Sequence, residues 1–136
     1  MFCDETNLGL SDRIARHIHA VSLAALPAAT IHATRRSLLD ALGVMLAATG
    51  LASDPLPYRA VARAQGAGPS RLLGCEEREP PAAAALANGA LAHALDFGDT
   101  FDPGPAHPNA ALVPALLALA DADPAIDGAR FIAAMA

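Results

Sequence analysis

The amino-acid sequence predicts an all-α protein that resembles part of a helical bundle. Ala and Leu supply much of the hydrophobic content, which is 54% of the residues, and both are strong helix formers. Aromatic residues make up only 4% of the chain, and strands favour aromatic and β-branched residues. Apolar residues also recur every three or four positions in several segments, which is the period of a helix with one buried face.

The first helix is expected from Ser11 to about Leu23, because Ser is a residue type that caps helix N-termini. Its apolar face consists of Ile14, Ile18, Val21 and Leu23. His17 and His19 are two positions apart and point to different faces of a helix. They are therefore predicted to be solvated and not to share a metal ion.

A longer second helix is expected to begin at Pro27, because proline is favoured at the first helical position. Gly50 is a suitable residue for its C-terminal end. The apolar stripe of this helix, predicted to pack in the core, contains Ile31, Leu38, Leu39, Leu42, Met45 and Leu46.

The middle of the chain is rich in turn-forming residues. A loop at 52–57 and a short helix at 58–65 are expected, followed by a break at the Gly and Pro residues of 66–69. One short strand or extended segment is predicted near 70–75. The polar stretch from Cys75 to Pro81 is expected to be an exposed loop.

Further helices follow this loop. One is expected at 82–95, where Gly89 stands in mid-helix and predicts close approach by another backbone. Another begins at Pro108, and Pro114 is expected to kink it or to start a new segment. A last helix is expected after Asp127, which is a good N-cap.

Composition excludes several classes of function. The net charge is −5, all nine basic residues are Arg, and no basic stripe is present, which argues against a nucleic-acid partner. Without Lys, Schiff-base and P-loop chemistry are excluded for this stretch. Cys3 and Cys75 are expected to be reduced thiols, and two cysteines cannot hold a four-thiolate iron–sulfur cluster.

Targeting and membrane signals are not evident. Asp4 and Glu5 stand where a signal peptide would carry basic residues. The longest apolar stretch, at 38–52, is interrupted by Asp40 and is shorter than the roughly 20 residues a membrane helix requires. A cytoplasmic protein with no membrane partner is expected.

The chemistry-bearing residues gather between 88 and 108. His93 and Asp96 are three apart and can share a helix face, so that the carboxylate orients an imidazole. His107 directly precedes a predicted helix start, where backbone N–H groups favour an anion. Such a loop can bind a carboxylate and move a proton beside it.

Other interpretations of these residues stay open. Asp96, Asp99 and Asp102 can cap helices or turns, and His93 can be a hydrogen-bonded core residue. The spacing of Asp96 and Asp99 is also found in the magnesium sites of all-α isoprenoid synthases, but the further acids of that motif are absent here. Asp96 to Gly98 spells a kinase motif by accident, since no upstream Lys accompanies it.

The order of motifs in this region resembles the MmgE/PrpD family. The motifs are Asn88-Gly89, then Leu91-Ala-His93-Ala-Leu-Asp96-Phe-Gly-Asp99-Thr100, then His107-Pro108, and then the apolar run 111–120. Shorter similarities lie upstream, at 26–27, 38–43, 73–74 and 81–84. The resemblance covers nearly the whole chain in order.

The resemblance implies that 1–136 is a single incomplete helical domain, the N-terminal portion of a longer chain with an α/β lid. Members of this family are often homodimers and act on citrate-like acids without a metal or cluster as cofactor. It implies part of a carboxylic-acid lyase resembling 2-methylcitrate dehydratase, inactive alone. A cis-aconitate-type decarboxylase is a lesser alternative, and a non-catalytic helical remnant or interaction module is an alternative of another class.

Carried over by position, the family's catalytic residues fall on Asp96, Thr100 and His107, and His93 and Asp99 are expected to contact the substrate. No residue is expected to bind a metal. The sequence departs from the family where Gly98 replaces a usual Asp. Asn109 replaces a common Ser after His-Pro.

Overall fold

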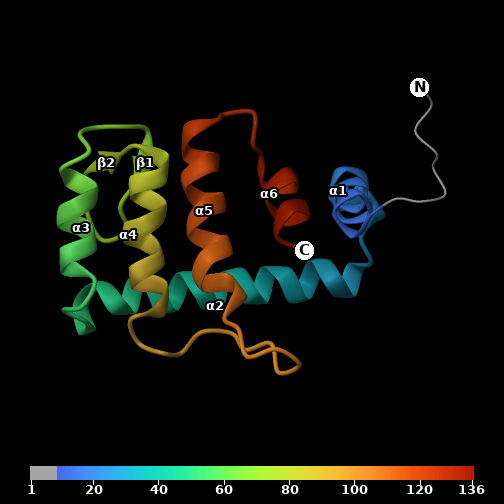
Figure 1. Ribbon diagram of the computed structural model, residues 1–136, viewed down its shortest axis with the longest axis horizontal. Helices are drawn as coiled ribbons and strands as arrows, with labels where there is room; N and C mark the ends of the chain where they lie inside the picture. Colours follow the sequence, from blue (N-terminus) through green and yellow to red (C-terminus); the bar gives the residue numbers. More distant parts are fainter. Residues whose placement is uncertain (1–8) are drawn as a thin grey trace.

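The computed structural model describes residues 9–136, which form six α-helices and one two-stranded hairpin. In Figure 1, α2 runs along the base of three upright neighbours, α3, α4 and α5, while α6 and α1 lie toward its other end. The helix bounds are α1 Leu10–Ala20, the 3-10 helix η2 Leu23–Ala25, α2 Ala28–Leu51, α3 Leu56–Arg63, α4 Pro81–His93, α5 Pro108–Ala122 and α6 Gly128–Met135. The predicted all-α class is confirmed.

Two buried clusters hold these helices together. The first lies where α4 and α5 meet α2 and contains Ala41, Met45, Ala48, Leu91, Ala92 and Val113. The second joins α3, α4, α5 and the hairpin and contains Ala62, Leu72, Ala83, Ala84, Ala87 and Ala118. Because most of these side chains are single methyl groups, the helix backbones approach closely.

Close approach is most evident between α4 and α5. A Cβ atom built on Gly89 would lie 3.5 Å from the carbonyl oxygen of Ala110, as the mid-helix glycine predicted. α5 continues through the buried Pro114 as one helix, so this proline starts no new segment. Proline has no N–H, so the carbonyl four residues earlier, that of Ala110, loses its usual donor.

The predicted helix ends were less accurate than the helices themselves. Gly9, not Ser11, occupies the N-cap of α1, with no side-chain hydrogen bond. Pro27 is the N-cap of α2 and not its first residue, and Gly50 lies inside that helix. Asp127 is confirmed as an N-cap, because its Oδ1 accepts a hydrogen bond of 2.8 Å from a backbone N–H of α6. Among these N-cap residues only Asp127 caps the helix with its own side chain, which is the feature a sequence pattern can reveal.

The hairpin pairs β1 (Ser70–Arg71) with β2 (Arg78–Glu79) in antiparallel register. The predicted extended segment near 70–75 is therefore present, but the exposed loop expected at 75–81 is wrong in its second half, where Glu79 is buried. A single extended segment leaves its backbone N–H and C=O groups without partners. Residues 78–79 return alongside β1 and pair with these groups.

Asn88 attaches this hairpin to α4. Its side chain is 1% exposed and makes two hydrogen bonds to the backbone at the end of β1 and just beyond it. The amide nitrogen donates to the carbonyl of Arg71 at 2.9 Å, and the amide oxygen accepts from the N–H of Leu73 at 3.0 Å. The side chain thus satisfies the same groups that a third strand would satisfy.

The apolar face predicted for the first helix does not pack into the core. Of its four residues, Ile14 and Ile18 are 48% and 67% exposed and Val21 and Leu23 are half-buried; Leu10, at the start of α1, is 70% exposed, and α1 has no buried residue. His17 and His19 on the same helix are exposed, as expected. Cys3 lies outside the described residues, and Cys75 is a half-buried free thiol.

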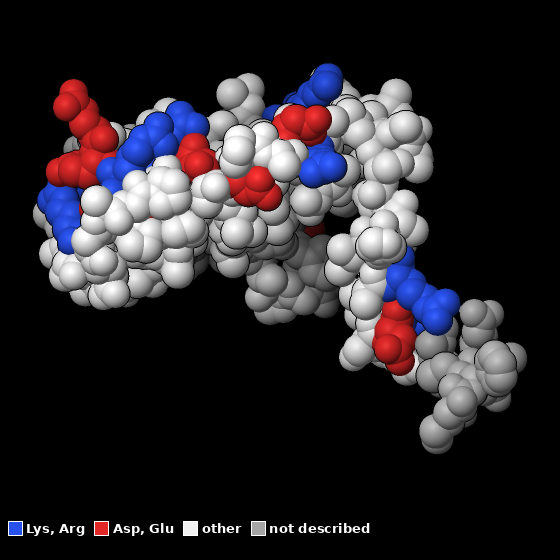
Figure 2. Space-filling model, turned by 90° about the horizontal axis from the view of Figure 1, so that it is seen from above, with Lys and Arg blue, Asp and Glu red and all other residues white. Residues whose placement is uncertain are grey.

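The surface carries mixed charges. On the face shown in Figure 2, acidic and basic side chains are interspersed and form no continuous basic stripe. Within residues 9–136, no single helix has the length and hydropathy to cross a membrane. α2 and α3 meet that test only jointly, with a bend of 96° between them.

Candidate active-site loop

The five predicted site residues lie at one end of the helical layer. His93 is the last residue of α4, and the others lie in the loop that leads from α4 to α5. This loop passes along the lower side of the molecule in Figure 1.

His107 is the most firmly positioned of these side chains. It is half-buried, and its Nδ1 lies 2.7 Å from the backbone carbonyl oxygen of Asp99. Its ring centroid is 5.5 Å from that of His93, with the rings tilted by 45°. Two imidazoles from opposite ends of the loop therefore come together.

Asp99 supports the loop from inside. Its Oδ1 accepts a hydrogen bond of 3.1 Å from the backbone N–H of Asn109, in the first turn of α5. A carboxylate at that position satisfies a free donor and interacts favourably with the helix dipole. The interpretation of Asp99 as a helix cap is thus confirmed. Its predicted contact with a substrate stays a prediction.

Two residues of this arrangement were missed by sequence reasoning. Asn109 is buried, and its Nδ2 donates to the hydroxyl oxygen of Ser37 on α2 at 2.6 Å. Nothing in the sequence relates Ser37 to the loop. Asn109 itself had a signal, because a polar residue beside a helix start in an apolar segment needs a buried partner.

Asp96 adopts a left-handed backbone conformation with φ of 54°, which Asp tolerates better than most residues. Its N–H donates to the carbonyl of His93 at 3.3 Å, at the end of α4. The side chain is exposed and makes no hydrogen bond to either imidazole in the described chain. The predicted orienting contact of Asp96 with an imidazole is therefore not present.

Thr100 and His93 face solvent. Exposure contradicts the alternative that His93 is a buried core histidine. Thr100 directly follows Asp99 but has no side-chain hydrogen bond within residues 9–136. Its predicted role as a donor to substrate is untested.

A groove of about 480 Å³ runs along α4 to His93. It is lined mostly by small residues of α4 and α5, including Gly89, together with Asp54 and Tyr58. The His93 imidazole is thus one of the polar groups on an open groove that is mostly apolar.

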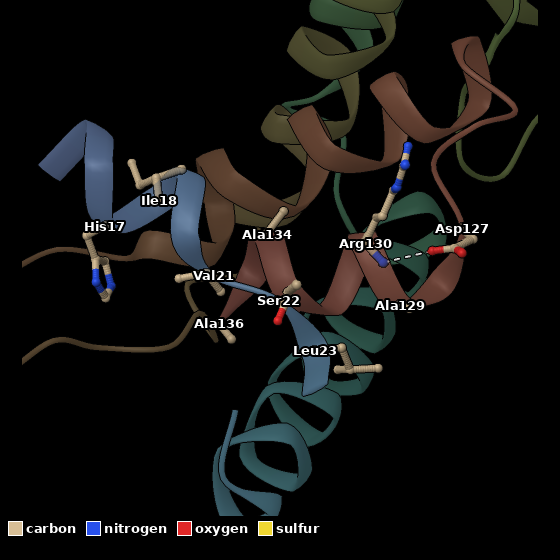
Figure 3. Close-up of a pocket in the computed structure, with 11 residues that line it drawn as sticks. His17, Ile18, Val21, Ser22, Leu23, Asp127, Ala129, Arg130, Ala134 and Ala136 are labelled. Atoms are coloured by element: carbon tan, nitrogen blue, oxygen red, sulfur yellow. Dashed lines mark hydrogen bonds between the residues drawn. The ribbon is translucent and has the colours of Figure 1, made fainter. Parts of the chain in front are cut away.

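A larger hollow, of about 660 Å³, lies between α1, η2 and α6 and is drawn in Figure 3. Its labelled walls are largely aliphatic, with Ile18, Val21 and Leu23 on one side. Asp127 at its edge already accepts the Arg130 N–H. Its ionisable lining residues are His17, Asp127 and Arg130, and within the described chain no contact between ring centroids is seen there like that of the two imidazoles of the loop.

The aspartates of the loop do not form a cation site. Among the described residues, no three His, Cys, Asp or Glu side chains lie close enough together to hold a metal ion. The magnesium interpretation of Asp96 and Asp99 therefore finds no support in the geometry, since Asp99 caps α5 and Asp96 faces solvent.

Comparison with known proteins agrees with the motif order. The MmgE/PrpD N-terminal domain matches residues 12–136. The chain is 32% identical over 120 residues to a cis-aconitate decarboxylase of Mus musculus, covering 86% of this chain. It is 31% identical over 116 residues to the Homo sapiens cis-aconitate decarboxylase, covering 85% of this chain.

The match covers only part of each relative. The aligned region is 24% of the length of each decarboxylase, so the chain spans about a quarter of these relatives. No solved structure matches it. Since the family domain extends over almost all of the sequence, the chain belongs to the MmgE/PrpD family.

Proposed function

We propose that this chain supplies the proton-transfer loop of a lyase that acts on a citrate-like tricarboxylic acid. The observation that carries the proposal is the pairing of His107 with His93, with the ring centroids 5.5 Å apart. One ring is held by a backbone carbonyl and the other is exposed beside a groove.

Two imidazoles suit the chemistry of such an acid. Loss of water or of carbon dioxide beside a carboxylate develops negative charge on carbon or on the adjoining oxygens. A nearby imidazolium stabilises that charge and an imidazole transfers the proton. Thr100 can donate one hydrogen bond to a carboxylate, and in the dehydration of 2-methylcitrate Asp96 can accept one from the substrate hydroxyl.

Of the two reactions expected from the sequence, the relatives favour decarboxylation of cis-aconitate. Both named relatives are cis-aconitate decarboxylases. Dehydration of 2-methylcitrate is the second candidate, because it requires the same proton transfer beside a carboxylate. We infer that residues beyond this region complete the site, since the relatives are about four times as long as the aligned segment.

The test is an assay of two proteins, the 136-residue chain and the longest in-frame product that contains it. Each is incubated with cis-aconitate and with 2-methylcitrate, and itaconate and 2-methylaconitate are measured by mass spectrometry. The longer product is expected to form itaconate, and the 136-residue chain is expected to form neither.

The His107→Gln variant of the longer product is expected to lose at least about a hundredfold in kcat, the usual contribution of a general acid or base. His19→Gln, an exposed histidine of α1, is the matched control and should keep full activity. Full activity of His107→Gln would remove this residue from the mechanism. Normal turnover by the 136-residue chain would show that the site needs nothing further.

A second function, as a helical interaction module, is favoured by a different observation. The apolar stripe of Leu10, Ile14 and Ile18 is exposed, and uncovered apolar stripes on helices are typical of binding surfaces. In that case the chain would associate without turnover in either assay.

A further inference from the structure

We propose that Asp99 fixes the tautomer of His107, so that Nδ1 always carries a proton and Nε2 alone exchanges one with the substrate. The use of Nε2 in catalysis depends on the proposed function. The tautomer itself does not, because it is a property of the chain without substrate.

The first step concerns the hydrogen bond at Nδ1. The partner of this nitrogen is the backbone carbonyl oxygen of Asp99, at 2.7 Å. A carbonyl can only accept, so the shared proton belongs to the imidazole nitrogen. The neutral ring therefore has its lone pair on Nε2, whereas a free histidine in water mostly protonates Nε2.

The second step concerns what keeps that carbonyl in place. Asp99 contacts the residues on both sides of Pro108, and the ring of Pro108 fixes its φ. The carbonyl of Asp99 accepts from His107, and its carboxylate accepts from the N–H of Asn109. Asn109 is itself held to α2 through Ser37. The Asp99 side chain is thus a positioning group for the imidazole.

The third step concerns the surroundings of the ring. A Cβ on Gly98 would lie 3.6 Å from the Cβ and from the Nδ1 of His107, so the backbone at 98 covers the Nδ1 side. Nε2 occupies the opposite side of the ring. Within residues 9–136 it has no hydrogen-bond partner.

The consequence for a reaction is a single route for the proton. In decarboxylation of cis-aconitate, the electron pair of the breaking C–C bond forms the CH2=C double bond of itaconate as carbon dioxide leaves, and the pair of the former double bond moves to the carbon beside the remaining carboxylate. The Nε2–H of the imidazolium then gives its proton to that carbon, and the ring becomes neutral. Nδ1–H keeps its hydrogen bond to Asp99 throughout, so the ring does not have to turn.

The experiment is long-range ¹H–¹⁵N correlation NMR on the 136-residue chain labelled with ¹⁵N-histidine, at a pH where the imidazoles are neutral. The signals of His107 are assigned by their loss in His107→Gln. We expect a protonated-nitrogen shift for Nδ1 and an unprotonated one for Nε2. The exposed His17 and His19 serve as internal references with the opposite preference.

Variants test the role of the Asp99 side chain. Asp99→Ala should raise the fraction of the Nε2-protonated tautomer of His107 several-fold, whereas Asp99→Asn should not, because its amide oxygen can still accept from Asn109. Asp127→Ala removes the comparable cap of α6 and controls for a general loss of stability. It should leave the His107 tautomer unchanged.

Each outcome decides the matter. If Nε2 carries the proton of His107 in the wild-type chain, the proposal is wrong whatever the activity assays show. If the tautomer is as stated but Asp99→Ala leaves it unchanged, the side chain has no positioning role. If Asp99→Ala unfolds, the wild-type and Asp99→Asn spectra still decide the tautomer. A correct tautomer with an inactive longer product would contradict the proposed function alone.

Discussion

At the scale of single residues, the polar side chains that matter most for the fold are buried and hydrogen-bonded to backbone. Asn88 was recognised in the sequence only as part of a family motif. In the structure it pairs with two backbone groups, one at the end of β1 and one just after it. An amide side chain inside an Ala-rich helix predicts some buried partner, but the sequence does not say which segment provides it.

We expect Asn88→Ala to lower the free energy of unfolding by about 3 kcal/mol, because it leaves two backbone groups without partners. Urea denaturation followed by circular dichroism measures the change. Gln65→Ala removes an exposed amide and is the matched control. Equal effects of the two substitutions would contradict the structural role given to Asn88.

Asp121 makes stability depend on pH. The Arg71 guanidinium, which donates to this carboxylate at 2.6 Å, holds the pKa of Asp121 below its ordinary value, with the Arg71 backbone N–H contributing. The folded state therefore favours the ionised form. The resulting stabilisation is complete above the ordinary pKa of 3.8 and is lost as the pH falls through the lowered folded pKa.

In denaturation experiments from about pH 6 to about pH 2, the wild-type chain should lose stability at the acidic end through this group, and Asp121→Asn should lose less. Asp102→Asn, in the exposed loop, is the control and should follow the wild-type curve. Parallel curves for wild type and Asp121→Asn would show that the ion pair contributes nothing.

At the scale of elements, the sequence predicted which segments are helical better than it predicted where they end or what they contact. α2, α4 and α5 have long apolar patterns, so their existence follows from composition. The second strand of the hairpin could not be predicted, because two residues have no period and β2 exists only through its pairing with β1.

Two glycines in different elements should respond oppositely to Ala. A Cβ on Gly68 would lie 2.3 Å from backbone atoms of Glu79 and Pro80, so Gly68→Ala should destabilise the chain by about 3 kcal/mol through forced separation of the hairpin. Gly43, inside α2, has nothing within 4 Å of such a Cβ. Gly43→Ala should therefore stabilise by roughly 1 kcal/mol.

Thermal and urea unfolding of both variants give the comparison. If Gly68→Ala and Gly43→Ala lowered the free energy of unfolding equally, the space around each glycine would not determine the effect. A neutral Gly68→Ala would mean that the 66–69 segment can move away from β2 without cost.

At the scale of the whole molecule, the candidate site was partly predictable. Its location between α4 and α5 followed from the polar residues at 88–108, and the cap role of Asp99 was one of the stated alternatives. The pairing of His93 with His107 and the bond from Asn109 to Ser37 could not be predicted. Both depend on how a loop folds back between helices, and local patterns do not record that path.

The uncovered face of α1 predicts concentration-dependent association of the 136-residue chain. The triple variant Leu10→Gln, Ile14→Gln, Ile18→Gln should shift light-scattering masses toward the monomer while changing the free energy of unfolding little, since α1 buries no residue. Arg13→Gln with Arg16→Gln, on the same helix, is the control for altered helix charge. A monomeric wild type at high concentration would contradict this prediction.

The hydrogen bond between Ser37 and Asn109 also bears on the order in which parts of the chain fold. It joins residues 72 positions apart, and contacts between residues distant along the chain form late in folding. α4 and α5 are joined by one loop and can therefore pair early. The loop that carries His107 should therefore become ordered only after α2 has docked. By the same reasoning, native-state hydrogen exchange at the Asn109 backbone N–H, which donates to Asp99, should report the loosening of the loop on departure of α2 rather than global unfolding.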